Sequence, residues 1–269
     1  MNILITGSNG YIAQAIFHKF KNIYNITQIN RQTLDLTDSS SLSSWFKDKY
    51  FDVIIHTAIV GGNRLLQEDM NIYNKNILMF KNLLNNKNHF NKLITFGSGA
   101  EIFSPNSPYG SSKRYINSII HTFENFYNLR IYAVFDHNEN ERRFIKSNIL
   151  RYIIGENLII HKDKFMDFIY MPDLLSIIEA YLINSGLPKT IDCVYNNKYK
   201  LSNITQLINE LDHHKKSNIK FCSSEMDNEY IGNFIDIGIN FIGLTTGINN
   251  TFNIMVNNYE KNMVRAQQV

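Results

Sequence analysis

The chain has 269 residues, of which 44% are hydrophobic and 19% charged, so a packed core is expected. Its net charge of +3 gives no reason to expect nucleic acid or an acidic membrane as a partner. Cys193 and Cys222 form no metal-binding or disulfide pattern, and no apolar run approaches the roughly 18 residues of a membrane span. We therefore expect a cytoplasmic protein without a metal site.

The first thirteen residues predict an anion-binding turn. An apolar run at residues 3–5 is followed by Gly7, Gly10 and Ala13, in the pattern Gly-x-x-Gly-x-x-Ala. A buried strand, a tight glycine turn and a helix start would point backbone N–H groups and the positive helix end at an anion. Taken alone, the pattern is equally compatible with an ordinary strand–turn–helix.

A second strand is predicted at residues 26–29, and it ends at Asn30 and Arg31. In a dinucleotide-binding fold this strand end meets the adenosine ribose, where an acidic residue favours NAD. No acid is present, and Arg31 can pair with a 2′-phosphate, so NADP(H) is favoured over NAD(H). The alternative for Arg31 is a solvated surface side chain. Asp35 is well placed to hold the amino edge of the adenine.

Helices and strands then alternate with short joints. Residues 39–49 and 68–84 have helical patterns, and residues 51–56 and 92–96 read as strands. The third strand runs into Thr57 and Ala58, where small residues let the backbone approach a cofactor closely. The alternation predicts a parallel, doubly wound α/β sheet with ligands at the carboxyl ends of its strands.

Tyr109 and Lys113 form the most informative motif. Residues four apart at a helix start lie on one face, one turn apart. A phenol ordinarily has a pKa near 10, and a neighbouring ammonium lowers the pKa of a phenol by favouring the phenolate. Lys113 can also hold the nicotinamide ribose. Ser98, at the end of the preceding strand, can donate to a reacting carbonyl. The alternative for the Tyr109 and Lys113 motif is an ordinary surface helix turn.

These motifs resemble those of the extended short-chain dehydrogenase/reductase family, the NAD-dependent epimerase/dehydratase group that acts on nucleotide sugars. Residues 7–13 are similar to its cofactor turn, Tyr109 and Lys113 to its catalytic pair, and residues 164–174 to its Arg-Asp-Phe-Ile-Tyr segment. Residues 34–38 and 58–62 are most similar to those of the GDP-fucose synthase subfamily. The resemblance implies a Rossmann domain and reduction of a 4-keto-6-deoxy sugar with NADPH.

The sequence departs from the family pattern around the catalytic serine. Ser98 precedes Tyr109 by only 11 residues, so a loop is missing, and an alternative register counted back from Phe103 puts the family serine at Gly99. We prefer Ser98 because it is the only hydroxyl beside the turn, with Thr95 as a poor substitute within the strand. The epimerising cysteine of the subfamily is absent, and Glu101 is either a base or a structural acid. His137 is the candidate match for the family histidine. Loss of the cysteine indicates reduction without double epimerisation.

We expect two domains. Residues 1–135, also receiving about 166–196, would form the NAD(P)-binding Rossmann domain, whose last strand is at 190–195. Residues 136–165 and 197–269 would form a smaller α/β lid that binds the nucleotide sugar. In the lid, Arg142 and Arg143 suit diphosphate oxygens, the alternative being a solvated helix face. Residues 202–204 are expected to cap a helix that runs to Leu211.

The expected function is NADPH-dependent reduction of a nucleotide-diphosphate 4-keto-6-deoxy sugar in the synthesis of cell-surface glycan precursors. The alternatives are a 4-epimerase or dehydratase with tightly held NAD, and a catalytically weak cofactor-binding regulator. A homodimer is expected from the family's pairing of the helices that hold residues 70–84 and Tyr109. The expected catalytic residues are Ser98, Tyr109 and Lys113. The expected cofactor residues are Gly7, Asn9, Gly10, Tyr11, Ile12, Asn30, Arg31, Asp35, Leu36, Thr57, Ala58 and Lys113. The expected substrate residues are Ser98, Gly99, Tyr109, His137, Arg142 and Arg143.

Overall fold

A computed structural model describes residues 1–62, 68–212 and 214–266, with side chains to residue 261. The chain divides into two compact units. The first unit consists of Met1–Ile131 and Ile177–Cys193, and the second of Tyr132–Ser176 and Val194–Val269. Within the described residues, no helix is both long and apolar enough to cross a membrane.

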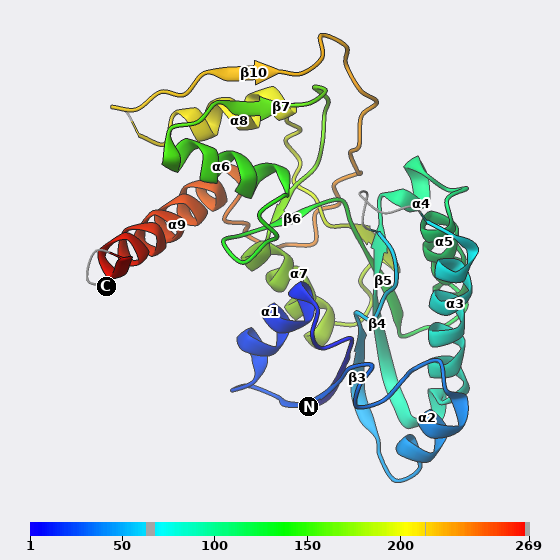
Figure 1. Cartoon of the computed structure of the whole chain (residues 1–269). Helices are drawn as coiled ribbons and strands as arrows, with labels where there is room; N and C mark the ends of the chain where they lie inside the picture. Colours follow the sequence, from blue (N-terminus) through cyan, green and yellow to red (C-terminus); the bar gives the residue numbers. More distant parts are fainter. Residues whose placement is uncertain (63–67, 213, 267–269) are drawn as a thin grey trace. The chain divides into compact units, whose positions relative to one another are not determined.

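Six parallel strands form the sheet of the first unit, in the spatial order β2-β1-β3-β4-β5-β9. Figure 1 labels β3, β4 and β5 of this sheet. The strands are β1 Asn2–Thr6, β2 Asn25–Ile29, β3 Phe51–His56, β4 Phe90–Ser98, β5 Phe126–Ile131 and β9 Thr190–Asp192. The chain leaves β1 for β2 on one side and then crosses to β3 on the other. The strand order therefore switches at the carboxyl ends of β1 and β3, where doubly wound sheets bind ligands. The predicted parallel, doubly wound sheet is confirmed.

Helices cover both faces of this sheet. Helices α2, α3 and α5 lie on one face and α1 on the other (Figure 1). The helices of the first unit are α1 Tyr11–Phe20, α2 Ser39–Phe46, α3 Met70–Asn85, the 3-10 turn η1 Lys87–His89, α4 Ala100–Phe103 and α5 Pro108–Ile120. Helix α7, Met171–Ile183, ends in this unit. Three of these helices begin at a side-chain cap, such as Asp38 before α2, whose carboxylate accepts from the N–H groups of Ser40 and Ser41.

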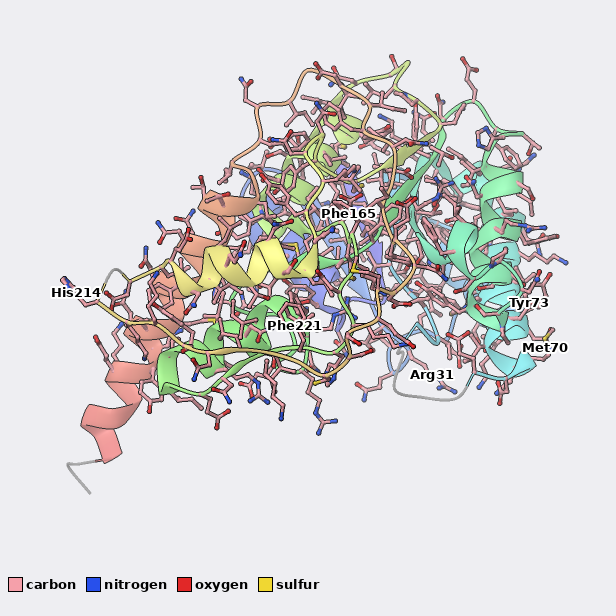
Figure 2. All side chains as sticks on the ribbon, turned by 90° about the horizontal axis from the view of Figure 1, so that it is seen from above. Arg31, Met70, Tyr73, Phe165, His214 and Phe221 are labelled. Atoms are coloured by element: carbon pink, nitrogen blue, oxygen red, sulfur yellow. The ribbon has the colours of Figure 1, made fainter. Side chains whose placement is uncertain are left out.

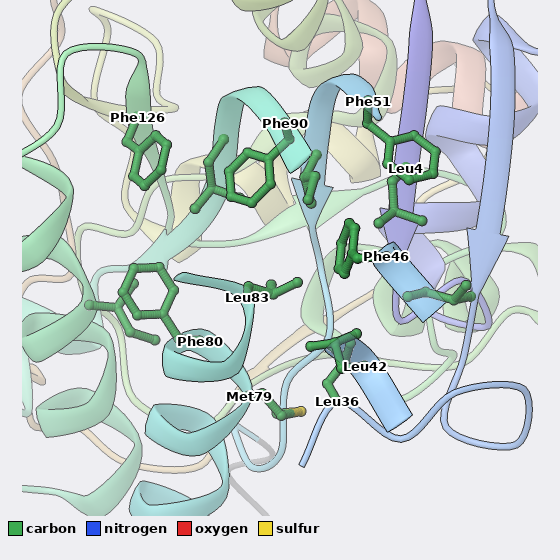
Figure 3. Close-up of a cluster of buried hydrophobic side chains, with 14 of the residues drawn as sticks. Leu4, Leu36, Leu42, Phe46, Phe51, Met79, Phe80, Leu83, Phe90 and Phe126 are labelled. Atoms are coloured by element: carbon green, nitrogen blue, oxygen red, sulfur yellow. The ribbon is translucent and has the colours of Figure 1, made fainter. Parts of the chain in front are cut away.

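The core of the first unit lies between the sheet and helices α2, α3 and α5 (Figure 3). Leu4 of β1 and Ile54 of β3 contribute to this cluster together with Phe46 and Phe80, and all four side chains are fully buried. Successive strand residues face opposite sides of the sheet, so the equally buried residues 3 and 5 pack on the other face. Burial on both faces explains why the strands read as continuous apolar runs.

The second unit contains two two-stranded sheets, β6 with β8 and β7 with β10. Its elements are β6 Val134–Phe135, α6 Phe144–Ile154, β7 Leu158–Ile160, β8 Ile169–Tyr170, α8 Leu201–Asn209, β10 Ile219–Phe221 and α9 Leu244–Ala266. Strand β8, which the sequence suggested would return to the central sheet, pairs with β6 instead.

The expected cap of α8 is wrong at Ser202 but confirmed at Asn203. The helix begins at Leu201, and Lys200 is its N-cap. The Lys200 N–H donates to Asn203 Oδ1 at 3.0 Å. Ser202 lies inside the helix. Its hydroxyl and its N–H both donate to the carboxylate of Asp163, so its side chain does not cap the helix.

Candidate active site

The turn after β1 requires glycine at position 7. Gly7 has a φ of +66°, and a Cβ built on it would lie 2.6 Å from the Cα of Ala58. The Gly10 N–H donates to the Gly7 carbonyl at 2.9 Å, which closes the turn. The turn after β1 and the start of the loop after β3 are therefore in backbone contact at the switch point of the sheet.

Among the described residues, the amino end of α1 has no side-chain cap, so its first N–H groups are open to an anion. Gly10 is its N-cap, and no side chain caps this helix end in the described structure. By contrast, α2, α3 and α5 are capped by the side chains of Asp38, Asp69 and Ser107. An uncapped helix start carries partial positive charge on its first N–H groups, here those following Gly10. The end of α1, with Tyr11 and Ile12 at its start, suits the pyrophosphate of a dinucleotide.

Polar contacts tie β3 to β1 beside this turn. The Thr57 hydroxyl donates to the Thr6 carbonyl at 2.6 Å. Thr6 Oγ1 lies 2.8 Å from His56 Nδ1 and accepts from the Ala58 N–H at 3.4 Å. Burial, with the charge of Lys113 as a smaller cause, lowers the pKa of His56 to about 3, so this ring is neutral at physiological pH. The contact of His56 with Thr6 joins the carboxyl ends of β3 and β1.

The loop after β2 presents Arg31 to solvent. Asn30 Oδ1 accepts from the N–H groups of Gln32 and Thr33, which folds the loop into a turn. The Arg31 side chain is 79% exposed (Figure 2), and its Nε lies 3.5 Å from Asp35 Oδ2. A surface pair of this kind is worth about 0–1 kcal/mol, so the guanidinium can exchange it for another anion.

Asp35 is already engaged within its own turn. Its Oδ1 accepts from the N–H and the hydroxyl of Thr37, at 2.9 and 2.8 Å. These bonds, with a smaller contribution from Arg31, lower the pKa of the Asp35 carboxyl. Asn9 lies beside this loop, with its Oδ1 3.4 Å from the Asn30 amide nitrogen. Leu36, the next residue, is buried in the core.

Tyr109 and Lys113 both belong to the first turns of α5. Ser107 accepts from the Gly110 N–H at 3.0 Å, and Glu68 Oε2 accepts from the Tyr109 N–H at 3.2 Å. The Lys113 ammonium is buried, donates to the Phe96 carbonyl at the end of β4 and lies 5.8 Å from the centroid of the Tyr109 ring. Burial lowers the pKa of Lys113 to about 8, and the nearby Glu101 charge opposes that shift.

The shortened segment before Tyr109 packs tightly against α5. A Cβ on Gly110 would lie 2.1 Å from the Ser104 carbonyl oxygen and 2.6 Å from that of Ala100. Glycine after the tyrosine therefore lets α4 and its following turn sit directly on the backbone of α5. The chain from Ser98 to Tyr109 is thus closed by this contact between α4, its following turn and α5.

The loop after β3 lies against the ring of Tyr109. A Cβ on Gly62, whose φ is +77°, would lie 3.0 Å from Cε2 and Cζ of that ring. The Gly62 N–H points to Glu68 Oε1 at 3.4 Å. Asn76 of α3 holds the loop from the other side, because its side chain accepts from the Val60 N–H and donates to the Val60 carbonyl. Gly62 thus lies against the tyrosine ring, and Val60 of the same loop is held by α3.

Ser98 ends β4 and Gly99 is the N-cap of α4. Ser98 Oγ accepts from the Ala100 N–H at 3.2 Å, and its own N–H donates to Glu101. Glycine at position 99 provides no hydroxyl. Ser98 is thus the hydroxyl at this strand end, whereas Thr95 is buried within the strand and donates to the Tyr127 carbonyl.

The second unit holds the other expected substrate residues. Arg143 is the N-cap of α6, and its Nε lies 3.3 Å from Glu139 Oε1. Burial raises the pKa of Glu139 to about 8, and Arg143 opposes that shift. Arg142 is exposed, and the His137 carbonyl accepts from Lys146. A separate cavity of about 390 Å³ in this unit is lined by Tyr195, Asn196, Asn197, Tyr199 and residues 242–246.

Within the first unit, the structure brings the glycine turn, Thr57 and Ala58 together at one end of the sheet, and it places Lys113 beneath the ring of Tyr109. The sequence did not reveal Glu68 or Asn76 as site residues. Asn76 was visible only as a polar residue inside an apolar helical pattern. Its contacts with Val60 and with Ser112 of α5 explain why a buried amide stands there.

A family model described as the NAD dependent epimerase/dehydratase family matches residues 3–196. A comparison with curated proteins found no match. A GDP-L-fucose synthetase from Naegleria fowleri bound to NADP is similar in structure, with 16% identity, a TM-score of 0.77, and coverage of 96% of this chain and 93% of that chain. The GDP-mannoheptose C4 reductase from Campylobacter jejuni with NADP bound has 16% identity, a TM-score of 0.75, and coverage of 94% and 97%. The dTDP-glucose 4,6-dehydratase from Bacillus anthracis in complex with NAD has 18% identity, a TM-score of 0.75, and coverage of 97% and 98%. At these identities the likeness shows a shared fold.

Proposed function

The chain belongs to the NAD-dependent epimerase/dehydratase family, and on that premise we propose that it uses NADPH to reduce the 4-keto group of a nucleotide-diphosphate 4-keto-6-deoxy sugar. The observation that carries the proposal is the buried Lys113 ammonium beneath the Tyr109 ring, at the carboxyl end of β4. This pairing would provide a proton donor and a positive charge beside the position expected for the reacting carbonyl.

In the proposed reaction, Tyr109 donates its phenolic proton to the carbonyl oxygen. The carbonyl carbon would receive its hydride from NADPH when that cofactor is bound. Lys113 stabilises the negative charge that develops on the Tyr109 oxygen, and the Ser98 hydroxyl donates to the carbonyl and polarises it. Solvent then restores the tyrosine proton.

The cofactor would lie across the switch point of the sheet. The uncapped start of α1 would hold the pyrophosphate, and Gly7 and Ala58 let the backbone approach it closely. Arg31 supports NADP over NAD because its guanidinium is exposed and only weakly paired. An arginine offers a planar fork that matches a 2′-phosphate.

The proposal excludes an epimerising or dehydrating acid–base role for Glu101. Its side chain is 2% exposed and pairs with Arg130 at 3.2 Å. A carboxylate held in this way has no path to a substrate proton. This supports simple reduction over the dehydratase alternative, which needs a further acid or base near the catalytic hydroxyl.

We further propose that the second unit binds the nucleotide sugar. His137 and the exposed Arg142 stand near the start of α6, and Arg143 is its N-cap. Arginines at a helix start suit the oxygens of a diphosphate. A homodimer through α3 and α5 is also proposed. On α3, Met70 and Leu78 leave 60% and 43% of their surface exposed, and Figure 2 labels Met70 at the start of this helix.

The test is the variant Tyr109→Phe. It should abolish turnover and leave NADPH affinity within about twofold, because only the proton donor is lost. Tyr115→Phe, a change of the same chemistry two turns further along α5, is the control and should retain activity. Turnover of Tyr109→Phe equal to that of the native protein would refute the proposed role.

A further inference from the structure

Glu101 stands in the first turn of α4, three residues after Ser98, and its carboxylate is fully engaged. Its Oε1 accepts from the Ser98 N–H at 3.0 Å and from the Asn128 amide at 3.3 Å. Its Oε2 accepts from Arg130 Nε at 3.2 Å. Both carboxylate oxygens are thus occupied by donors from β4 and β5.

These bonds fix the backbone turn that carries Ser98. Glu101 holds the Ser98 N–H, and the Gly99 N–H donates to the Ile131 carbonyl at 2.9 Å. The Ser98 hydroxyl in turn accepts from Ala100. Gly97 makes the arrangement possible, because a Cβ there would lie 2.3 Å from Glu101 Oε1. The position of the Ser98 side chain therefore depends on a carboxylate that touches its backbone.

The same carboxylate contributes charge to the site. Glu101 and Asp192 share a single guanidinium, that of Arg130, with Asp192 Oδ1 at 2.6 Å from Nη1. This cluster therefore keeps one net negative charge in the interior. The charged and titratable groups that face Lys113 from the packed elements are Glu101 of α4, His56 of β3 and Tyr109 of α5 itself. Geometry brings Glu101 close to Lys113, because the ammonium donates to the Phe96 carbonyl and Glu101 Oε1 lies against Gly97, the next residue. Because His56 is neutral, Glu101 is the negative charge beside the Lys113 ammonium among the residues that the structure describes.

We propose that Glu101 is a positioning residue that holds the Ser98 turn in place and supplies the negative charge beside Lys113, rather than an acid or base of the reaction. The inference rests on the proposed function, because it assigns its effects to Ser98 and Lys113. From the sequence alone, Glu101 could be a catalytic base or a structural acid, and the proposal gives it a third role.

Two substitutions separate the two effects. Glu101→Gln removes the charge, so the basic limb of the pH profile of kcat should move to lower pH, because Lys113 then loses its proton more readily. Glu101→Asp keeps the charge and withdraws the oxygen from the Ser98 N–H. It should lower kcat, by up to about 10²-fold for a displacement near 1 Å, with the basic limb unmoved and KM for NADPH unchanged.

Asp192→Asn is the matched control. Asp192 is also buried and binds the same guanidinium, but it has no bond to the Ser98 turn. This variant should lose stability while its kcat and its basic limb stay those of the native protein. An Asp192→Asn variant that shifts the limb as Glu101→Gln does would assign the effect to general loss of the ion cluster and overturn the inference.

A carbon NMR titration of the Lys113 Cε, in the full chain without substrate, provides a readout that does not depend on turnover. The native pKa is expected at about 8, and the pKa in Glu101→Gln should be lower. If the native protein reduces no keto sugar, the proposed function fails while this titration still decides the electrostatic role of Glu101. Equal Lys113 pKa values in the two proteins, or an unchanged kcat in Glu101→Asp, would overturn the inference.

Discussion

Substitution of Gly7 by alanine tests the geometry of the nucleotide turn most sharply. Gly7 has a φ of +66°, a conformation that costs an L-residue about 1–2 kcal/mol. The new methyl group would also lie 2.6 Å from Ala58 Cα and 2.7 Å from Ala58 N. Both are backbone atoms, so the clash is relieved only by separating β1 from the loop after β3. Overpacking of this kind costs a further 1–3 kcal/mol, roughly.

Gly186→Ala is a matched control in the same unit. Gly186 has a φ of +80°, but a Cβ there would have no atom within 4 Å. The control therefore carries the conformational cost without the steric one. The two free energies of unfolding, from urea denaturation, should differ by about 1–3 kcal/mol. Because the clash involves backbone, adding Ala58→Gly should restore little of the lost stability.

NADPH binding provides the second assay for this prediction. Fluorescence titration should show weakened NADPH binding in Gly7→Ala, because the turn and Ala58 must move apart where the pyrophosphate is expected. Gly186→Ala should bind NADPH normally. If Gly7→Ala loses no more stability than Gly186→Ala and binds NADPH as well, the close approach of the two backbones at the switch point is refuted.

Arg31→Ala should weaken NADPH binding by about 10- to 100-fold, as expected for loss of a charged hydrogen bond of 1.5–3 kcal/mol, and should change NADH binding little. Arg151→Ala, which removes a surface arginine paired with Glu156, is the control, and equal losses for both cofactors would remove the argument for NADP. Ser98→Ala should reduce kcat by roughly 10²-fold, as loss of a carbonyl-polarising donor does, and Ser98→Thr should recover most of that rate. An unchanged rate in Ser98→Ala would transfer the role to Thr95 or to water.

The architecture of the first unit could be read from the sequence because its signals are local. Apolar runs at residues 3–5 and 51–56 are bounded by glycine or polar residues, and both are buried strands. The cap of α8 could not be read in the same way. Ser202 looks like a cap in isolation, but its hydroxyl is bound by Asp163, 39 residues earlier in the chain. When a side chain has two possible hydrogen-bond partners, tertiary contacts decide which one it binds.

The site residues could also be predicted only where the signal is local. The spacing of Tyr109 and Lys113 is enough to predict that they share a helix face, and Lys113 lies beside the tyrosine ring. The role of Glu101 could not be settled, because its partner Arg130 is 29 residues away on another strand. Glu68 was missed for the same reason, since it meets the Tyr109 N–H from 41 residues earlier.

The most direct test of the central claim is to follow NADPH oxidation by the native protein against a panel of nucleotide-diphosphate 4-keto-6-deoxy sugars, with the products identified by NMR. The proposed function predicts one NADPH consumed for each 4-hydroxy sugar formed, with at least one member of the panel. Conversion of a sugar without net oxidation of NADPH would contradict it and indicate an epimerase or dehydratase. Tight NADPH binding with no conversion of any sugar would indicate a protein that binds the cofactor without turning it over.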